Sequence, residues 1–255
     1  MKKQLYIWAL LLTAICQNSC AQVITAVDSM VVVPTKSKPF NYKQFILPVT
    51  LMTYSIIGLE SESIKSINSG LREEITEHID KKITIDDFSQ YAPALTVYAL
   101  NNLGIKGQHN LRDRSIILAT SYLLMTSVVL PLKNISHIER PDGSSYNSFP
   151  SGHTATAFVG AEFLWQEYKD VSVWYGISGY IVAAGTGAFR IYNNRHWLTD
   201  VTMGAGIGIL STKIAYWTFP YINRMFQRKN SQNTGMISPF YNGKQLGIGM
   251  ILNTK

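Results

Sequence analysis

Three short polar segments of this 255-residue chain hold side chains whose types and spacing could carry out a reaction. The first contains two cations, Lys133 and Arg140, with six residues between them. Both follow directly after an apolar stretch, and Pro141 stiffens the exit, so the two side chains can converge on one anion. A basic pair that merely flanks a membrane helix would give the same pattern.

The second segment is Pro150-Ser151-Gly152-His153, which precedes another apolar stretch. Proline and serine are typical of the first positions of a helix. We therefore expect the backbone N–H groups of Ser151 and Gly152 to point outward at a free helix end, where an anion is favoured. His153 would stand beside that anion. A plain helix cap explains Pro150 and Ser151, but it gives His153 no role.

The third segment runs from Arg190 to Asp200 and contains His196. If a helix begins near Trp197, His196 and Asp200 lie four positions apart on one face. A carboxylate in that place can hold the imidazole Nδ1–H and leave the Nε2 lone pair free to attack an electrophile. The plainer interpretation makes Asp200 a first-turn acid and His196 a polar residue at a helix end.

Other polar residues near these segments carry less chemistry. His78, His109 and His137 show no comparable partners in the sequence. The Asn193-Asn194-Arg195 run borders His196 and is a candidate for substrate contact.

Apolar helical stretches must position the three segments. They are expected at 45–59, 91–103, 115–132, 154–168, 173–189 and 201–222. The stretch 115–132 has 18 residues without a charge and is the strongest candidate for a membrane span. Small residues within 173–189, such as Gly176, Gly179 and Gly185, suit close helix packing. The fold class is therefore all-α, a helical bundle, with a polytopic membrane arrangement expected.

Two further elements complete the predicted fold. Isoleucines at helical spacing predict an amphipathic surface helix over 62–82, with an interruption at Gly70. Residues 245–252 follow Asn242-Gly243 and predict a short C-terminal strand or hairpin.

The N-terminus has the layout of an export signal. Two lysines precede an apolar run that ends at Ser19-Cys20-Ala21. An uncleaved first helix and lipidation at Cys20 are the alternatives. The expected division is a signal peptide at 1–21, an exported lead-in at 22–44, a catalytic domain at 45–230 with its motif core at 115–222, and a polar tail at 231–255. Cys16 and Cys20 both lie in the leader, so the mature chain would have no thiol for a disulfide or a cysteine-bound metal.

The formal net charge of +7 favours anionic substrates or a membrane surface. We see no basic run with interleaved aromatic residues, so nucleic acid is not an expected partner. Basic residues cluster before the 115–132 stretch and after the last one, and both clusters are expected in the cytoplasm. They are Lys106, Arg112, Arg114, Arg224, Arg228 and Lys229. Counting helices between the clusters places 133–150 and 190–197 together on the exported side.

The combined spacing resembles a known family. Lys-x6-Arg-Pro, then Pro-Ser-Gly-His, then Arg-x5-His-x3-Asp is similar to the signature of the type-2 phosphatidic acid phosphatase (PAP2) superfamily. The motifs cover 133–200, and the helical pattern is similar from about 90 to 222. One position departs: the family usually has serine before the arginine, whereas this chain has Phe189.

The resemblance implies a phosphoryl transfer in two steps. His196 would attack phosphorus and form a phosphohistidine, with Asp200 orienting the ring. His153 would protonate the leaving alkoxide and later activate water. The phosphoryl oxygens would be bound by Lys133, Arg140, Ser151, Gly152 and Arg190. No metal or other cofactor is required, because three cations can neutralise the charge.

The resemblance leaves three functions open. The first is a phosphatase of envelope lipids at the periplasmic face of a bacterial inner membrane, acting on lipid A, phosphatidylglycerol phosphate, undecaprenyl diphosphate or phosphatidic acid, with lipid A slightly favoured. The second is a soluble periplasmic acid phosphatase, and the third is a vanadium-dependent haloperoxidase. The expected partners are a phosphorylated lipid and the membrane, and nothing in the sequence predicts an oligomeric state.

Overall fold

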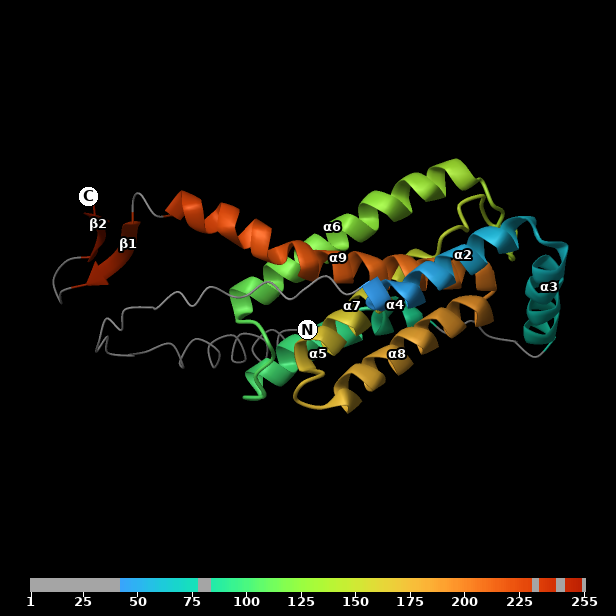
Figure 1. The fold of residues 1–255 in the computed structure, drawn as a ribbon, viewed down its shortest axis with the longest axis horizontal. Coiled ribbons are helices and arrows are strands. Elements are labelled where there is room, and N and C mark those ends of the chain that lie inside the picture. Colours follow the sequence, from blue (N-terminus) through green and yellow to red (C-terminus); the bar gives the residue numbers. More distant parts are fainter. Residues whose placement is uncertain (1–41, 78–83, 231–233, 242–245, 254–255) are drawn as a thin grey trace, which may run out of the picture. The chain divides into compact units, whose positions relative to one another are not determined.

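The structure is a computed structural model that describes residues 42–77, 84–230, 234–241 and 246–253 (Figure 1). All of them belong to one compact unit, Pro39–Lys255. The expected signal peptide and nearly all of the expected lead-in lie outside the described residues, and so does His78.

The described chain is helical except at its C-terminal end. The helices are η1 (Tyr42–Phe45), α2 (Ile46–Glu60), α3 (Glu62–Thr76), α4 (Asp86–Ser89), α5 (Ala92–Asn102), α6 (Leu111–Ser136), α7 (Gly152–Tyr168), α8 (Val173–Tyr192) and α9 (Leu198–Asn230). Two strands follow, β1 (Thr234–Tyr241) and β2 (Leu246–Asn253). They pair antiparallel, with Thr234 opposite Asn253 and Tyr241 opposite Leu246. The all-α class is confirmed, and β2 lies where the strand was expected.

The six apolar stretches each become a helix whose ends lie within a few residues of the prediction, apart from α9, which continues to Asn230. The amphipathic segment differs. Its helix, α3, runs through Gly70 without a break and ends at Thr76. A Cβ on Gly70 would meet nothing within 4 Å, so this glycine has open space beside it and no packing reason to break the helix.

Helix α7 is the centre of the bundle, because 12 of its 17 residues are buried. It packs against α5, α6, α8 and α9. The approach of α9 depends on glycine: a Cβ on Gly204 would lie 2.5 Å from the Ser151 carbonyl oxygen, and one on Gly208 would lie 2.5 Å from the Ala155 carbonyl oxygen. Larger residues at these two positions would push α9 away from the start of α7.

Small residues of α8 serve the same purpose on the other side of α7. Gly176 faces the Trp165 ring and Gly179 faces Leu164. Gly185, which was expected to pack in the same way, has nothing within 4 Å of its would-be Cβ. The expectation of close packing therefore holds for two of these three glycines.

A buried ionic network fastens the bundle far from the three motifs. The His109 ring and the Tyr216 hydroxyl both bond to Glu167 Oε1, at 2.7 Å each. The buried Arg114 side chain donates to the His109 carbonyl oxygen and lies 3.8 Å from Glu167. His109 therefore has a carboxylate partner, contrary to expectation. Arg114 is part of the core and not a free membrane-flanking cation.

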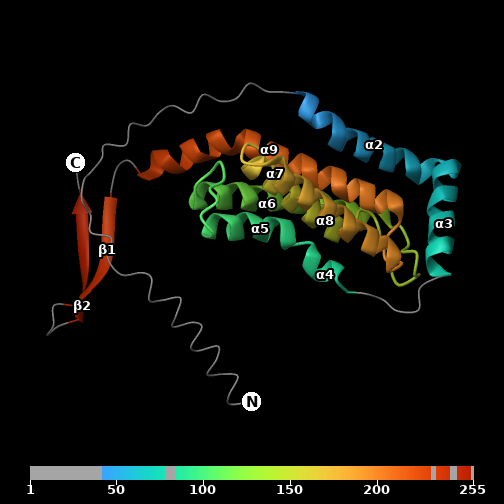
Figure 2. The same ribbon diagram turned by 90° about the horizontal axis from the view of Figure 1, so that it is seen from below.

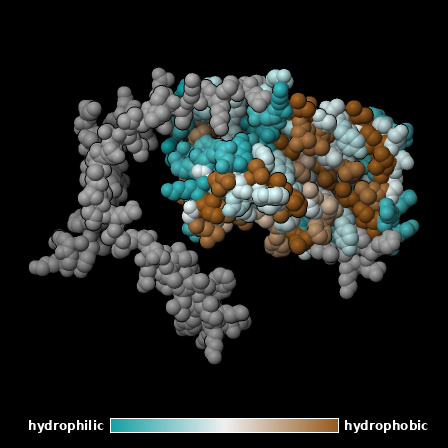
Figure 3. All heavy atoms as spheres, turned by 60° about the horizontal axis from the view of Figure 1, so that its bottom comes forward, coloured by the Kyte–Doolittle hydropathy of each residue, from teal (hydrophilic) through white to brown (hydrophobic). Residues whose placement is uncertain are grey.

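Helix α6 is the one helix within the described residues that is long and apolar enough to cross a membrane. Only 22% of its most apolar 18-residue window is buried, and Leu123, Leu130 and Ile135 are largely exposed. Apolar side chains also cover much of the face drawn in Figure 3. An apolar surface of this kind fits a protein that associates with a membrane. The polytopic arrangement stays a prediction.

Candidate active site

The three predicted segments meet at one end of the bundle. The C-terminal ends of α6 and α8 and the N-terminal ends of α7 and α9 all lie there, because consecutive helices run in opposite directions (Figure 2). Hydrogen bonds tie the connecting segments together. Trp197 Nε1 donates to the Glu139 carbonyl oxygen at 2.8 Å, and Arg195 Nη1 donates to Asp142 at 3.2 Å. The expectation that 133–150 and 190–197 share one end of the molecule is confirmed.

His196 and Asp200 form a buried pair. His196 Nδ1 lies 3.4 Å from Asp200 Oδ2, and the two side chains are 2% and 0% exposed. Helix α9 begins at Leu198, so His196 precedes the helix rather than lying on it. Asp200 reaches back from the first turn, and its Oδ2 also accepts from the Trp197 N–H at 2.9 Å. Asp200 is thus both a helix-capping acid and the partner of the histidine.

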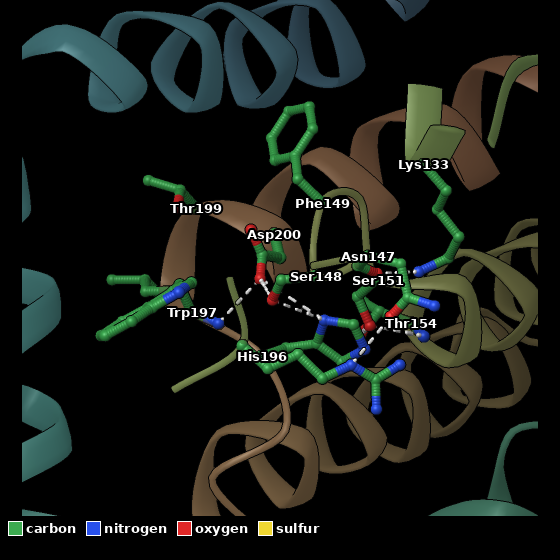
Figure 4. Close-up of polar contacts among 12 residues, drawn as sticks. Lys133, Asn147, Ser148, Phe149, Ser151, Thr154, His196, Trp197, Thr199 and Asp200 are labelled. Carbon is green, nitrogen blue, oxygen red and sulfur yellow. Dashed lines mark hydrogen bonds and ion pairs between the residues drawn. The ribbon is translucent and has the colours of Figure 1, made fainter. Parts of the chain in front are cut away.

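Ser148 completes the surroundings of this pair. Its hydroxyl donates to Asp200 Oδ2 and lies 3.5 Å from His196 Nδ1. Figure 4 shows Ser148 and Asp200 on one side of the His196 ring and Lys133 with Asn147 on the other. A ring held at Nδ1 in this way presents its Nε2 to the side of the cations.

The electrostatic setting keeps His196 neutral. Burial lowers its pKa to about 4, the nearby cations Lys133 and Arg190 also lower it, and Asp200 opposes the shift. A neutral imidazole with a free lone pair is the form that acts as a nucleophile. At neutral pH the His196 ring is therefore in the form that the predicted role as a nucleophile requires.

The two cations of the first motif converge as expected, and Asn147 joins them. Lys133 Nζ donates to the Asn147 carbonyl oxygen at 2.9 Å, and Arg140 Nε donates to Asn147 Oδ1 at 3.1 Å. Burial lowers the pKa of Arg140, and the neighbouring Arg190 and Arg195 lower it further. Several positive charges therefore crowd one region, which favours an anion among them.

Arg190 is the third predicted phosphate-binding cation and is 8% exposed. Its Nη1 donates to Asp86 Oδ2 at 2.6 Å, and the Asn193 amide donates to Asp86 Oδ1 at 3.1 Å. Arg190 Nε has no hydrogen-bond partner among the described residues. A buried donor left open in this way suits a phosphoryl oxygen.

The start of α7 corrects one expectation. The Ser151 N–H donates to the Asp200 carbonyl oxygen at 3.0 Å, so it does not point outward at a free helix end. The Ser151 hydroxyl caps α7 and bonds to Thr154 Oγ1 at 2.8 Å. Gly152 has little beside it, because a Cβ there would meet only Lys133 Cε, at 3.8 Å. Ser151 therefore joins α7 to α9, and the binding of an anion by the Gly152 N–H stays a prediction.

His153, in the first turn of α7, is 31% exposed and has its own carboxylate partner. Its Nε2 lies 2.9 Å from Asp87 Oδ1. Burial and Arg190 lower the pKa of His153, while Asp87 and Asp86 raise it.

Asp86, Asp87 and His153 also present ligand atoms within 4.8 Å of one another, a spacing that could hold a metal ion. Both carboxylate oxygens of Asp86 are, however, engaged by Arg190 and Asn193. A cation would have to compete with the guanidinium for this carboxylate. The geometry therefore fits an ion-pair network better than a metal centre.

Sequence reasoning missed four residues of this region. They are Asp86, Asp87, Asn147 and Ser148. Asp86 and Asp87 lie more than 60 residues before their partners, and nothing in the local pattern connects them. Asn147 and Ser148 stand directly before the Phe149-Pro150 pair. Their position between two motifs is the feature of the sequence that could have indicated a place in the site.

The helical bundle and its site define a class: a helical protein in which cations gather near a carboxylate-backed histidine, an arrangement that suits a tetrahedral oxyanion. Residues 114–224 match the sequence profile of the PAP2 superfamily. This part of the chain is a PAP2 superfamily domain, as the motifs predicted.

The chain is also similar to individual proteins. The chain is 41% identical over 141 residues to a lipid A 1-phosphatase of Porphyromonas gingivalis, a match that covers 55% of this chain and 32% of the relative. The chain thus spans about a third of that protein's length. Among solved structures, it is similar to Aquifex aeolicus LpxE (26% identity, TM-score 0.45, 58% of this chain and 94% of that one). It is also similar to a PAP2-type phosphatidylglycerolphosphate phosphatase of Bacillus subtilis (20% identity, TM-score 0.43, 72% and 96%).

Proposed function

We propose that this protein is a phosphatase that removes a phosphate monoester from an envelope lipid through a phosphohistidine intermediate. One observation carries the proposal: the bundle brings the Asp200-backed His196 to the end where the cations Lys133, Arg140 and Arg190 also lie. Phosphoryl transfer needs a positioned nucleophile, charge neutralisation around three oxygens and an acid for the leaving group.

The residues divide the reaction into two steps. In the first, His196 Nε2 attacks phosphorus while His153 gives a proton to the departing alkoxide. In the second, His153 takes a proton from water, whose oxygen attacks phosphorus and releases His196. Lys133, Arg140, Arg190 and the Gly152 N–H hold the phosphoryl oxygens throughout.

An open apolar groove, lined by residues that neighbour Arg190 and Asp200 in the chain, supports a lipid substrate. Its volume is about 420 Å³, and its lining comes from α2, α7, α8 and α9. Leu198 and Val201 lie within two residues of Asp200, and Ala188 and Ile191 lie within two residues of Arg190. A groove of this composition can take an acyl chain while the headgroup reaches His196. The identity to a lipid A 1-phosphatase favours a lipid A phosphate among the envelope lipids.

The site is proposed to face the periplasm, with the protein held in the inner membrane. Asp200 and Tyr216 of α9 are about 24 Å apart at the rise of an α-helix, close to the thickness of a bilayer's apolar core. Lys106 lies before α6 and Arg112 lies in its first turn, at the end of the bundle where Tyr216 lies. Arg224 follows Tyr216 on α9. Basic residues favour the cytoplasmic side, which leaves the site on the other side.

The test is phosphate release by the purified protein in detergent. The panel contains lipid A, phosphatidic acid, phosphatidylglycerol phosphate and undecaprenyl diphosphate, with p-nitrophenyl phosphate as the small soluble ester. We expect at least one lipid to exceed p-nitrophenyl phosphate in kcat/KM. A preference for the soluble ester by protein that stays in solution without detergent would favour the acid phosphatase instead. Halide oxidation by vanadate-loaded protein, with no phosphate release, would favour the haloperoxidase.

A further inference from the structure

Two histidines of the site each have a carboxylate partner, but only one pair lies within a motif. The second pair joins α4 to α7, with Asp87 Oδ1 2.9 Å from His153 Nε2, and the two residues are 66 positions apart in the chain. The Asp87 side chain is 52% exposed, so the contact is not forced by burial alone. The contact between Asp87 and His153 therefore requires other residues that hold α4 in place.

Helix α4 is fastened to α8 by its neighbouring residues. Asp86 is 1% exposed and accepts from Arg190 Nη1 at 2.6 Å and from Asn193 Nδ2 at 3.1 Å. The Ser89 hydroxyl bonds to the Thr186 hydroxyl at 2.8 Å. These contacts fix α4 on both sides of Asp87, and Gln90 closes the turn by donating to the Asp87 carbonyl oxygen at 2.9 Å.

The charged groups that face His153 are Asp87, Asp86 and Arg190. Asp87 is the one in direct contact. A carboxylate at Nε2 keeps a proton on that nitrogen, so Nδ1 becomes the nitrogen that exchanges protons with the substrate. It also stabilises the charged imidazolium against the desolvation that opposes it.

We propose that Asp87 is a positioning residue for His153. Helix α4 would thereby provide the carboxylate partner of the histidine that acts as acid and base. The inference rests on the proposed function. In the first step the Nδ1 proton of His153 passes to the alkoxide oxygen as the bond from phosphorus to that oxygen breaks and the bond to His196 Nε2 forms. In the second step a water proton returns to Nδ1 as the water oxygen bonds to phosphorus and the bond to His196 breaks. Asp87 accepts from Nε2–H throughout and is not itself protonated.

This role makes the effect of Asp87 depend on the leaving group. An alkoxide is a poor leaving group and needs the proton, whereas p-nitrophenolate leaves with little help. A residue that only maintained the fold would affect both substrates alike. The leaving group therefore separates positioning from structural support.

The experiment compares Asp87→Asn with the full-length parent on dioctanoyl phosphatidic acid and on p-nitrophenyl phosphate, in one detergent. We expect kcat to fall at least about tenfold with the alkyl ester and less than about threefold with the aryl ester. The alkaline limb of the kcat profile with the alkyl ester should also move to lower pH, because the variant loses a charge that raises the pKa of His153. Glu60→Gln, which removes an exposed carboxylate at the end of α2, is the matched control and should change neither value.

Equal losses on the two esters, or no loss on either, would overturn the positioning role while the parent's activity stands. Loss of parent activity on addition of a chelator, with recovery on a divalent cation, would also overturn it, because Asp86, Asp87 and His153 would then hold a metal. A parent that releases phosphate from neither ester and from no other lipid of the panel would instead overturn the proposed function itself.

Discussion

Asp200 does two things at the start of α9, since one carboxylate oxygen accepts both from the Trp197 N–H and from the Ser148 hydroxyl while it faces the His196 ring. The other oxygen, Oδ1, is buried and has no partner within the described part of the chain. The capping contact fixes the carboxylate, and the fixed carboxylate orients the proposed nucleophile. The function proposed for His196 therefore depends on how a helix begins.

Replacing Asp200 with asparagine should remove the charge and keep the cap, because the amide oxygen can still accept from the Trp197 N–H. We expect kcat to fall more than about tenfold, since the amide can favour the wrong imidazole tautomer. The measurement is kcat on the best substrate, with a thermal unfolding midpoint close to that of the parent as the sign of an intact fold. A smaller loss would mean that Asp200 is only a capping acid.

The two histidines predict an acidic pH optimum. The nucleophile must be neutral, and burial places the pKa of His196 at about 4, so activity should rise above that pH. His153, the proposed acid, must be protonated. Burial together with Arg190 lowers its pKa from the ordinary 6.5, so activity should fall as the pH rises, at a pH below 6.5. The profile of kcat/KM, which reports the free enzyme, should peak between these limits. A maximum in the alkaline range would contradict the assignment of these roles.

The candidate site residues within the motifs could be predicted from the sequence. Their contacts with residues distant in the chain could not. Lys133, Arg140, His196 and Asp200 became candidates from local spacing around helix ends, and the resemblance to the PAP2 signature implied their roles. The use of the Ser151 N–H by the Asp200 carbonyl oxygen depends on how closely α9 approaches α7, which only the packed structure shows. The same holds for Asp86 and Asp87, whose partners are set by the position of α4.

At the scale of elements, hydrophobic runs located every long helix, because an apolar stretch bounded by polar residues is a strong local signal. The extent of α3 and the buried network around Glu167 were not predictable, since both depend on contacts with distant helices. The strand β1 contains Pro239 and has no clear alternation, so the sequence left a single strand and a hairpin both open, and the structure shows the hairpin.

The apolar groove gives a prediction at this scale. Ala188→Phe should fill part of the groove beside α9 and lower kcat/KM for the lipid substrate at least about tenfold, because a partly blocked groove buries less of an acyl chain. p-Nitrophenyl phosphate has no acyl chain, so activity on it should stay within about threefold of the parent. The substitution removes binding of the remote chain and leaves the chemical step unchanged. The matched control is Ile181→Phe, on the same helix at a position that is 66% exposed and does not line the groove. Equal losses on both substrates would show that the groove does not hold the lipid.

At the scale of the whole molecule, the orientation in the membrane can be measured with single cysteines. Ser144 is exposed beside the site, and Met225 is 75% exposed near the other end of α9. In a background without Cys16 and Cys20, a membrane-impermeant thiol reagent should label Ser144→Cys once the outer membrane is permeabilised, and it should spare Met225→Cys. The reverse pattern would overturn the proposed orientation, and equal labelling of protein recovered without membranes would favour a soluble enzyme.

The most direct measurement of the central claim is the capture of phosphate on His196 during turnover. The purified full-length protein is mixed with a lipid substrate carrying labelled phosphate, quenched in alkaline detergent within the first turnover, and analysed for labelled protein. Label bound to the parent that is stable in base, released by acid and absent from His196→Ala is the predicted result. Rapid phosphate release by the parent without any labelled protein, or normal turnover by His196→Ala, would contradict a phosphohistidine mechanism at this site.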